Sequence, residues 1–357
     1  MTIFFTLWDG FDMIYRQTTN QTQKRKTCMK PKKEISIRDI AARSGYSTAT
    51  VSRVLNRQGG YSDAARKKIL DIVEEYNYST GSAGVPTVGI LVPDLTNEWF
   101  ADVTRKLEQQ LYAHNYHCCI CSTGEDPSRE RFCFEGFVSQ KVAAVISFLG
   151  SDELAALSRS SSFPVVFIDQ VPEEEKGFLR LEFDNYLGGY MATELLIRKG
   201  CRRIVYIGWH QPASVSRFRQ KGYSDALKDY GLSTDPELIL DIGGSDQQFE
   251  RTKNLVYYTI RRKVAFDGIF ASNDLRASGA LEALKQSGIE VPFQVKIIGY
   301  DDTTACCQCY PALSTVRQDP DILVKNTIEL LFRQLEQHTR LTEHRVLPVS
   351  IVERMTT

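Results

Sequence analysis

This 357-residue sequence has few of the features that mark enzymes or membrane proteins. No segment approaches the roughly 18 consecutive apolar residues of a membrane-spanning helix. No G-x-G-x-x-G loop joins a strand to a helix, and neither a P-loop nor a G-x-S-x-G motif occurs, which argues against nucleotide-dependent enzymes and serine hydrolases. The five histidines are scattered along the chain. We therefore predict a binding protein and no enzyme.

The nine cysteines do not form the pattern of a disulfide framework, because their number is odd and their spacing is clustered. Six of them lie in two groups, Cys118, Cys119 and Cys121, and then Cys306, Cys307 and Cys309. Neither group has the C-x-x-C pairs and the fourth ligand that tetrahedral zinc requires, so we predict no metal and no cofactor. Residues 1–17 contain Asp9 and Asp12 and lack the basic start of a secretory signal. The sequence thus indicates a reducing compartment, the cytoplasm.

The net charge of zero conceals an uneven distribution of charge along the chain. Residues 1–84 contain 14 Lys and Arg against 8 Asp and Glu, whereas the remainder contains 30 against 36. Most of the basic excess lies in residues 24–68, which hold 13 bases and 3 acids. A basic cluster is often only a solvated face, but it is also what phosphate contact requires. The front of the chain is therefore a candidate DNA-binding region.

The segment from Ile35 to Asn56 has the pattern of two short helices joined by a tight turn. Each helix has one apolar stripe, formed by Ile37, Ile40 and Ala41 and by Val51, Val54 and Leu55. Between them, Gly45 is the residue type that most easily adopts the left-handed conformation ending a helix. Ser47 is a natural N-cap for the second helix. The pattern predicts a helix-turn-helix.

The string D-I-A-x-x-S-G-x-S-x-A-T-V-S-R-V-L-N, from Asp39 to Asn56, closely resembles the headpiece of the lactose-repressor (LacI/GalR) family of bacterial transcription regulators. In this motif the N-terminal half of the second helix enters the major groove of DNA. The expected DNA contacts are Ser47, Thr48, Ala49, Thr50, Ser52, Arg53 and Asn56. We expect Arg53 to contact a base, Thr48 and Ala49 to face base edges, and the others to hold phosphates.

The headpiece is expected to cover residues 34–78. A third helix, from Ala64 to about Tyr76, would close its core and begin at a cap formed by Ser62 or Asp63. Residues 1–33 fit nothing downstream, and they contain a second methionine, Met29, before the basic stretch. We expect either that translation begins at Met29 or that residues 1–33 are a disordered extension.

Residues 79–86 have the composition of a flexible linker. At this place the resembling family inserts a hinge helix with an Asn-x-x-Ala-Arg-x-Leu pattern, whose leucine opens the minor groove. Here Gly81 stands near the Asn position, Ala83 comes too early, and the Arg and Leu are missing from a shorter segment. This departure argues against an intercalating wedge and against the family's usual coupling of sensor to DNA.

From Thr87 onward, strands alternate with helices, which predicts parallel α/β sheets. The expected strands cover residues 89–93, 118–122, 143–148, 164–169, 203–208, 238–242, 268–273 and 295–302, with helices between them. Two wound halves, roughly 87–185 and 186–314 with a final crossing, resemble the two-lobed fold of periplasmic sugar-binding proteins. The expected fold class is an all-α helix-turn-helix headpiece followed by a two-lobed α/β ligand-binding and dimerisation domain, residues 87–357.

Polar residues gather where these strands end, and wound α/β sheets bind their ligands at that edge. The expected effector contacts are Asn97, Trp99, Phe100, Asp169, Arg219, Asn273 and Asp301. We expect Trp99 to be the exposed ring that stacks on a sugar, while core packing would explain the other aromatic. Arg219 stands where the resembling family supplies a guanidinium to sugar hydroxyls. Asp274 is expected to cap a helix, and Gln247 or Gln248 is expected to line the cleft as well.

Together these features favour a cytoplasmic repressor that binds a near-palindromic operator as a homodimer and senses a small sugar. Dimerisation is expected because one headpiece reads only a few base pairs. A purine is the alternative effector, since the resembling family includes both. Another alternative is a sugar sensor whose atypical linker has weakened its DNA binding. A sugar-transport protein shares the two-lobed fold but requires an export signal and has no headpiece.

Overall fold

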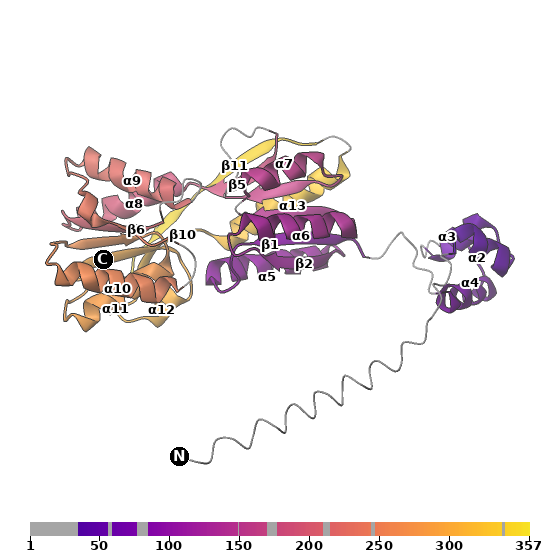
Figure 1. Cartoon of the computed structure of the whole chain (residues 1–357), viewed down its shortest axis with the longest axis horizontal. Coiled ribbons are helices and arrows are strands. Elements are labelled where there is room, and N and C mark those ends of the chain that lie inside the picture. The colour runs from indigo at the N-terminus through magenta and orange to yellow at the C-terminus, as the bar shows by residue number, and fades with distance from the viewer. Residues whose placement is uncertain are drawn as a thin grey trace, which may run out of the picture. The chain divides into compact units, whose positions relative to one another are not determined.

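The computed structural model describes residues 35–55, 59–76, 85–148, 150–169, 177–209, 215–243, 247–337 and 340–357 (Figure 1). They belong to two compact units that divide between Gly84 and Val85. Each unit has its own hydrophobic core. The expected N-terminal extension, Asn56 and linker residues 79–84 lie outside the described residues, so the predictions made for them are not tested by the fold.

The described part of the smaller unit is helical, with α2 (Ile37–Ser44), α3 (Thr48–Leu55) and α4 (Asp63–Glu75). Helix α2 begins with a capping box, in which the Asp39 backbone N–H donates to Ser36 Oγ and the Ser36 backbone N–H donates to Asp39 Oδ2. Helix α4 begins at Ser62, whose Oγ accepts from the Ala65 backbone N–H at 3.2 Å. Of the two expected caps, Ser62 is therefore the one used.

Three short helices are stable here because each contributes to a shared core. Ile40 of α2, Val51 and Val54 of α3, and Ile69 of α4 are buried and in contact with one another. At 0–4% exposure these side chains leave almost no apolar surface in water. Helices this short are marginal alone, so the mutual burial is what holds α3 in place.

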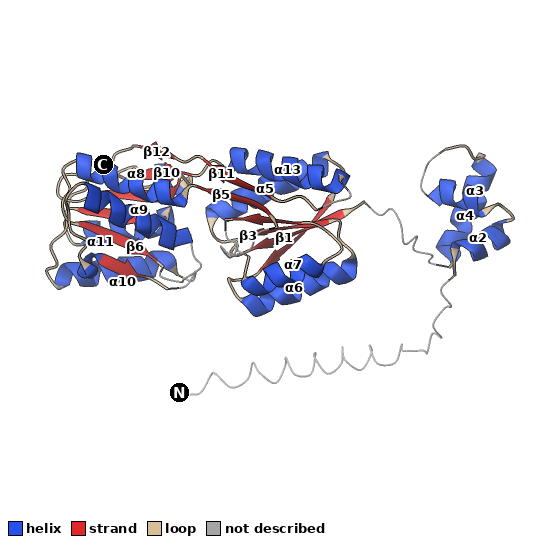
Figure 2. Cartoon of the chain, turned by 90° about the horizontal axis from the view of Figure 1, so that it is seen from above, coloured by secondary structure: helices blue, strands red, loops and turns tan. Residues whose placement is uncertain are grey.

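The first lobe of the larger unit is a parallel six-stranded sheet with the order β11-β5-β4-β3-β1-β2. Its strands are β1 (Thr87–Val92), β2 (His117–Ser122), β3 (Ala144–Phe148), β4 (Val165–Ile168), β5 (Leu179–Phe183) and β11 (Glu343–Leu347). Helices α5 (Glu98–Ala113) and α13 (Pro320–Glu336) cover one face, and α6 (Pro127–Gln140) and α7 (Asp152–Ser160) cover the other (Figure 2).

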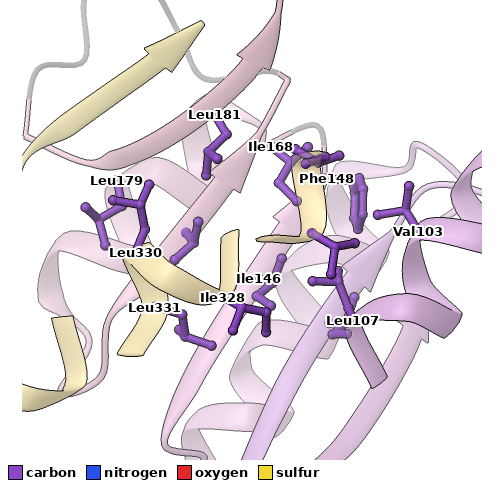
Figure 3. Close-up of a cluster of buried hydrophobic side chains, with 14 of the residues drawn as sticks. Val103, Leu107, Ile146, Phe148, Ile168, Leu179, Leu181, Ile328, Leu330 and Leu331 are labelled. Atoms are coloured by element: carbon purple, nitrogen blue, oxygen red, sulfur yellow. The ribbon is translucent and has the colours of Figure 1, made fainter. Parts of the chain in front are cut away.

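Helices on both faces explain why the central strands are apolar along their whole length, as in buried parallel sheets. Figure 3 shows the core under α5 and α13, where Val103 and Leu107 face Ile146 and Phe148 of β3. Leu330 and Leu331 of α13 complete this core from a segment far along the chain. Helix α13 is therefore part of the first lobe, although it follows the second lobe's strands in the chain.

The second lobe repeats the design with the strand order β12-β10-β9-β8-β6-β7, in which only β12 runs antiparallel to its neighbour among the described pairings. Its strands are β6 (Ile204–Gly208), β7 (Ile239–Asp241), β8 (Gly268–Ala271), β9 (Lys296–Asp301), β10 (Ser314–Arg317) and β12 (Ser350–Val352). Its helices are α8 (Asn185–Arg198), α9 (Val215–Asp229), α10 (Gln248–Arg261), α11 (Asp274–Gln286), α12 (Ala305–Gln308) and the 3-10 turn η1 (Pro236–Leu238).

The predicted alternation of strands and helices is confirmed, and the expected third helix of the headpiece, Ala64 to about Tyr76, differs from α4 by one residue at each end. The chain crosses between the lobes three times, after β5, after β10 and after β11, which is one crossing more than the sequence analysis expected. Strands β5, β10, β11 and β12 were missed because each mixes polar with apolar residues, as strands near a sheet edge do. These crossings place two connecting segments beside the polar strand ends described below.

Candidate functional site

The second helix of the headpiece, α3, is positioned by its turn. Gly45 ends α2 with φ of 76°, a left-handed conformation that costs glycine little. Ser47 then caps α3, because its Oγ accepts from the Thr50 backbone N–H at 3.1 Å. The Ser47 and Thr50 hydroxyls are also 2.9 Å apart, so they bind each other. The side chains of both residues therefore take part in forming the start of α3. Any phosphate contact that they make would be in addition to these hydrogen bonds.

Helix α3 has two different faces. Val51 and Val54 are buried in the headpiece core, while Thr48, Ala49 and Arg53 are exposed on the other side. Positions 48, 49, 52 and 53 share one face because residues four apart are neighbours on a helix. The exposed face therefore consists of the residues that the sequence analysis expected to meet base edges. Ser52 is half-buried on the same face.

Not every basic residue of the headpiece is available to contact DNA. The Arg43 guanidinium donates to the Tyr76 hydroxyl at 2.6 Å and lies 4.5 Å from the centre of that ring. This contact ties the end of α2 to the end of α4. By contrast, Arg66, Lys67 and Lys68 on α4 are exposed, and they give the unit a basic surface.

Arg219, on α9, is the centre of the polar cluster in the sensor domain. Its side chain is 5% exposed, and its guanidinium lies 3.5 Å from the centre of the Tyr300 ring. Arg219 Nε donates to Asn185 Oδ1 at 2.8 Å, and Nη1 donates to the Ser272 carbonyl. Nη1 also lies 3.8 Å from Asp301 Oδ1. These contacts hold the guanidinium in one orientation, as a fork that receives a ligand requires.

The backbone that carries Arg219 is placed by an unusually close approach of α8 and α9. A Cβ atom on Gly189 would lie 2.1 Å from the Arg219 carbonyl oxygen, and one on Gly222 would lie 2.2 Å from the Tyr186 carbonyl oxygen. Only glycine fits at these positions, because backbone atoms cannot rotate away as a side chain can. The R-x-x-G-Y motif, from Arg219 to Tyr223, therefore supplies both the guanidinium and the glycine that lets α8 and α9 approach closely.

Asp169 follows β4 of the first lobe, Asp301 is the last residue of β9 in the second lobe, and both have unusual backbone conformations. Their φ angles are 65° and 112°, a region that non-glycine residues rarely adopt and that is common at functional sites. Asp169 Oδ1 is buried and has no hydrogen-bond partner, and Asp301 Oδ1 accepts from Gln318 Nε2 at 2.8 Å. Such a buried acceptor without a partner is costly unless a ligand satisfies it.

Burial shifts the titration of both carboxyl groups. It raises the pKa of Asp169 to about 6 and that of Asp301 to about 8, although the nearby Arg219 guanidinium acts in the opposite direction on each. Asp169 also raises the pKa of Asp301. The two lobes therefore bring Asp169, Arg219 and Asp301 into one electrostatic cluster, as the sequence analysis expected.

Asn273 lies in the same cluster but has a structural function as well. Its Oδ1 caps α11 by accepting from the Arg276 backbone N–H at 2.8 Å, and its Nδ2 donates to Gln248 Oε1 at 2.7 Å. Gln248 is 8% exposed, whereas Gln247 begins α10 with a left-handed backbone and no side-chain cap. Of the two candidates left open by the sequence, Gln248 is the one that joins the cluster.

Asp274 is structural, but it is not the helix cap that the sequence analysis expected. Its Oδ2 accepts from the Thr303 backbone N–H at 2.8 Å, and its Oδ1 accepts from Thr315 Oγ1 at 2.6 Å. Asp274 therefore ties the start of α11 to the loop after β9 and to β10. The cap is Asn273, one residue earlier, because the capping residue precedes the first helical turn.

The prediction that Trp99 is the exposed ring is wrong. Trp99 is 4% exposed and packs edge-on against Phe148 and Phe183 in the first-lobe core. Phe100 is half-buried and is the more accessible of the two neighbouring rings. Asn97 caps α5, with its Oδ1 accepting from the Trp99 backbone N–H at 2.9 Å. Trp99 and Phe100 are consecutive residues of α5, and consecutive side chains of a helix with 3.6 residues per turn point in different directions.

Trp99 instead connects the first lobe to the cluster through a crossing segment. Its indole Nε1 donates to the Gln318 carbonyl at 3.1 Å, and the Gln318 side chain holds Asp301. The neighbouring residue, Glu98, makes a second contact between the lobes. Its Oε1 accepts from the Thr304 backbone N–H at 3.0 Å and from the Thr304 hydroxyl. The lobes are therefore joined by polar contacts on the ligand side of both sheets.

Sequence reasoning missed several residues of this cluster, among them Asn185, Tyr300, Gln318 and Arg276. Asn185 and Gln318 lie just after β5 and β10, so the rule that ligands bind beyond strand ends would have found them if both strands had been assigned. Arg276 had a signal of its own, because a basic residue stands in the apolar run of α11. Its side chain is 5% exposed.

The two cysteine groups lie outside this cluster. The eight described cysteines are free thiols. Burial raises the pKa of Cys118 and of Cys121 to about 12, which favours the protonated thiol over the reactive thiolate.

Comparison with known proteins gives the two units an identity. A model of bacterial regulatory proteins of the lacI family matches residues 36–81, and a model of the periplasmic binding protein-like domain matches residues 193–357. A helix-turn-helix headpiece followed by a two-lobed ligand-binding domain defines the class of ligand-controlled transcription regulators.

Relatives cover nearly the whole chain. The ribose operon repressor of Haemophilus influenzae is 30% identical over 309 residues, which span 84% of this chain and 92% of that protein. The chain therefore belongs to the lacI family of bacterial regulatory proteins. It is a DNA-binding transcription regulator controlled by a small effector, and its family is not enzymatic. None of the described helices is long and apolar enough to cross a membrane.

Two solved structures share the fold. A periplasmic binding protein/LacI transcriptional regulator from Alkaliphilus metalliredigens, complexed with D-xylulofuranose, is 29% identical, with a TM-score of 0.67 over 76% of this chain and 98% of that chain. The lac repressor dimer bound to operator and the anti-inducer ONPF is 22% identical, with a TM-score of 0.72 over 91% of this chain and 99% of that chain.

Proposed function

We propose that this protein is a cytoplasmic repressor, in which a headpiece of residues 34–78 and a linker of residues 79–86 precede a sensor domain of residues 87–357. Two copies bind a near-palindromic operator, and a neutral sugar in the sensor cleft changes their affinity for it. The observation that carries the proposal is the convergence of Asp169, Arg219 and Asp301 from two lobes, with the buried Asp169 Oδ1 left without a partner.

The DNA part of the proposal rests on the exposed face of α3. Arg53 reads a base edge, because an arginine fork can make two hydrogen bonds to a guanine. Thr48 and Ala49 face neighbouring base edges, where the Ala49 methyl can contact a thymine methyl. Ser47, Thr50, Ser52 and Asn56 hold phosphates and set the position of the helix. Since the linker lacks the family's hinge pattern, α3 carries more of the recognition than it would beside a hinge helix.

A homodimer follows from the same argument. One recognition helix contacts only a few base pairs, and two copies related by a two-fold axis supply both affinity and half-site spacing. The lac repressor structure, which is a dimer on its operator, supports this proposal by its shared fold.

A sugar is the favoured effector because the cluster mixes acceptors, such as Asp169 and Asp301, with the Arg219 and Asn273 donors. Asn97 and the half-buried Phe100 lie at the end of β1, where a ring edge can border the ligand. The names of relatives agree, since one is a ribose operon repressor and another was solved with D-xylulofuranose. A purine base is the second candidate, and it would require stacking between rings that this cluster largely buries.

A thermal-shift screen of the purified chain against neutral sugars and purine bases tests the effector. We expect a neutral sugar to raise the unfolding temperature, and Arg219→Lys to remove the shift because a lysine lacks the guanidinium fork. A shift with purine bases alone would contradict the sugar proposal.

The DNA activity is tested by fluorescence anisotropy with DNA from upstream of the protein's own gene. We expect binding that a scrambled sequence does not compete for, and a change in affinity when the sugar is added. Sugar binding with no sequence-specific DNA binding would favour a sensor whose linker has weakened its contact with DNA.

A further inference from the structure

Two charged residues outside the family motif face the effector cluster from opposite lobes. Glu125 belongs to the first lobe and lies just after the carboxyl end of β2. Arg276 belongs to the second lobe and lies in the first turn of α11, just after β8. Both positions are at strand ends, the edge at which wound α/β sheets bind ligands.

Arg276 is directly connected to the effector cluster. Its Nη1 donates to Ser272 Oγ at 2.6 Å, and the carbonyl of the same serine accepts from Arg219. Two guanidinium groups therefore converge on one residue after β8. Arg276 is 5% exposed, yet its Nε has no hydrogen-bond partner. A buried guanidinium with an unused donor is expensive, which points to a missing acceptor.

Glu125 has the complementary deficiency. Its Oε2 is buried and has no hydrogen-bond partner. Burial raises its pKa, while Arg276 acts to lower it; burial likewise lowers the pKa of Arg276, while Glu125 acts to raise it. Each group thus lies in the field of the other, but among the ion pairs of the described residues none joins them. One acceptor of the first lobe and one donor of the second lobe therefore have no partner.

We propose that Glu125 and Arg276 bind the same hydroxyl group of an uncharged sugar, one from each lobe, and exclude its phosphorylated form. A hydroxyl satisfies both atoms at once, because its O–H donates to Glu125 Oε2 while its oxygen accepts from the Arg276 Nε–H. A phosphate at this position brings only acceptors and negative charge, so the Glu125 carboxylate repels it. This inference rests on the proposed function, since it names the class of sugar that the cluster accepts.

A bridging hydroxyl also gives the sugar a means of holding the lobes together. The contact with both residues exists only when the lobes are closed on the ligand. The sugar therefore binds the closed state more tightly than any open one, and this difference in affinity is what a ligand needs in order to shift a conformational equilibrium.

The test is isothermal titration calorimetry on the full chain with D-ribose, D-xylulose, D-glucose and cellobiose, and with D-ribose 5-phosphate, D-xylulose 5-phosphate and D-glucose 6-phosphate. We expect the wild-type chain to bind a neutral sugar at least about tenfold more tightly than its phosphate ester. Glu125→Gln and Arg276→Met should each weaken the neutral sugar by about tenfold or more. Glu125→Gln should also reduce the discrimination against the ester.

Matched surface changes serve as controls. Glu290→Gln and Arg105→Met remove the same groups from exposed positions and should leave sugar affinity unchanged. The unfolding temperature without ligand separates a binding role from a structural one. Arg276→Met should not lower it, because it removes a poorly partnered buried charge. If it does fall, Arg276→Lys decides, since it keeps the charge but lacks Nε, and unchanged sugar affinity in that variant would overturn the proposal.

Three results would overturn the inference. The first is an unchanged affinity in both Glu125→Gln and Arg276→Met while Arg219→Lys abolishes binding, which leaves the proposed sugar function intact. The second is a phosphate ester that binds the wild-type chain more tightly than its neutral sugar. The third is the absence of binding by every sugar of the panel, which contradicts both this inference and the proposed function.

Discussion

In the headpiece, the residues proposed to read base edges are exposed side chains within two turns of α3. The residues proposed to bind the effector are buried or half-buried and come from segments between Asn97 and Asp301. Among the described residues, the buried polar atoms without partners all belong to the sensor domain. DNA presents a large surface and protein–DNA interfaces are hydrated, so exposed side chains can make the contacts that read its sequence. A small ligand must be surrounded, so its site has to bury polar groups in advance.

This difference has an energetic consequence. The headpiece can change its reading residues with little effect on its core, because Val51 and Val54 point away from them. The sensor cannot, because Arg219 is at once a proposed ligand contact, the neighbour of Tyr300 and part of the α8–α9 contact. Sites with unsatisfied buried groups are typically less stable than they could be. The predictions below test this contrast.

The largest effect is expected where the sensor packs most closely. Gly189→Ala places a Cβ atom 2.1 Å from the Arg219 carbonyl oxygen, so α8 and α9 must separate. We expect a loss of roughly 3 kcal/mol in the stability of the sensor domain, measured by chemical denaturation. Gly136→Ala is the matched control, because a Cβ atom there meets nothing within 4 Å. Equal stability in the two variants would show that α8 and α9 do not approach as described.

A smaller effect, limited to the affinity for DNA, is expected from substitutions in the headpiece. Arg53→Ala should weaken operator binding by about 1–3 kcal/mol and relax the preference at one base pair, because it removes a base contact from an exposed position. Ser52→Ala should weaken all DNA sequences by the same, smaller factor. Fluorescence anisotropy with single-base operator variants measures both. If Arg53→Ala left affinity and preference unchanged, its assignment as a base reader would be wrong.

For the Arg53 variant, the effector affinity provides the control. It should equal that of the wild-type chain, because Arg53 belongs to a compact unit that has its own hydrophobic core. A loss of sugar binding in Arg53→Ala would show that a change in the headpiece alters the effector site, and it would contradict the contrast drawn between the two.

The sensor should also respond to pH through Asp301. Because burial raises its pKa to about 8, the folded state keeps the proton that the unfolded state releases near pH 4. The folded state binds more protons between these values, so this group lowers stability as the pH rises from about 4 to 8. Asp301→Asn removes the effect.

We therefore expect Asp301→Asn without ligand to gain stability relative to the wild-type chain as pH rises, by roughly 1–2 kcal/mol between pH 5 and pH 8. Denaturation curves at four pH values measure this difference. A difference that stays constant with pH would show that Asp301 is ionised throughout the range.

The smallest effect is expected at the contact between lobes made by Glu98. Glu98→Gln weakens the hydrogen bonds to Thr304, which lie at an exposed position where solvent screens charge. We expect effector release to become about two- to fivefold faster, with little change in the association rate. Stopped-flow displacement measures the release rate, with Glu290→Gln as the surface control. An unchanged release rate would mean that this contact does not help to hold the lobes closed.

Much of the architecture was predictable because it depends on local patterns. Apolar stripes of period 3.6 identified α2, α3 and α4, and alternating apolar strands and helices identified the parallel sheets. What was missed had weak local signals. Strand β5 mixes Arg180 and Glu182 with leucines, and β11 is short and polar. Their pairing is decided by neighbours distant in sequence.

The effector cluster shows the same limit. Arg219, Asp169 and Asp301 were found because each stands at a strand end or in a motif. Trp99 was misassigned because its burial depends on Phe148 and Phe183, which the helical pattern of α5 does not reveal. Glu125 and Arg276 were not found, since nothing in the local sequence shows that each keeps a buried atom without a hydrogen-bond partner.

The sequence by itself determined the helix-turn-helix, the class of regulator and the face of α3 that carries Arg53, because a helix places residues four apart on one face whatever surrounds it. Only the tertiary structure decided which polar groups of the sensor are buried, which of them have partners and which residues of the two lobes meet. Burial and partnership are properties of pairs brought together by the three crossings between lobes, and no single segment contains them.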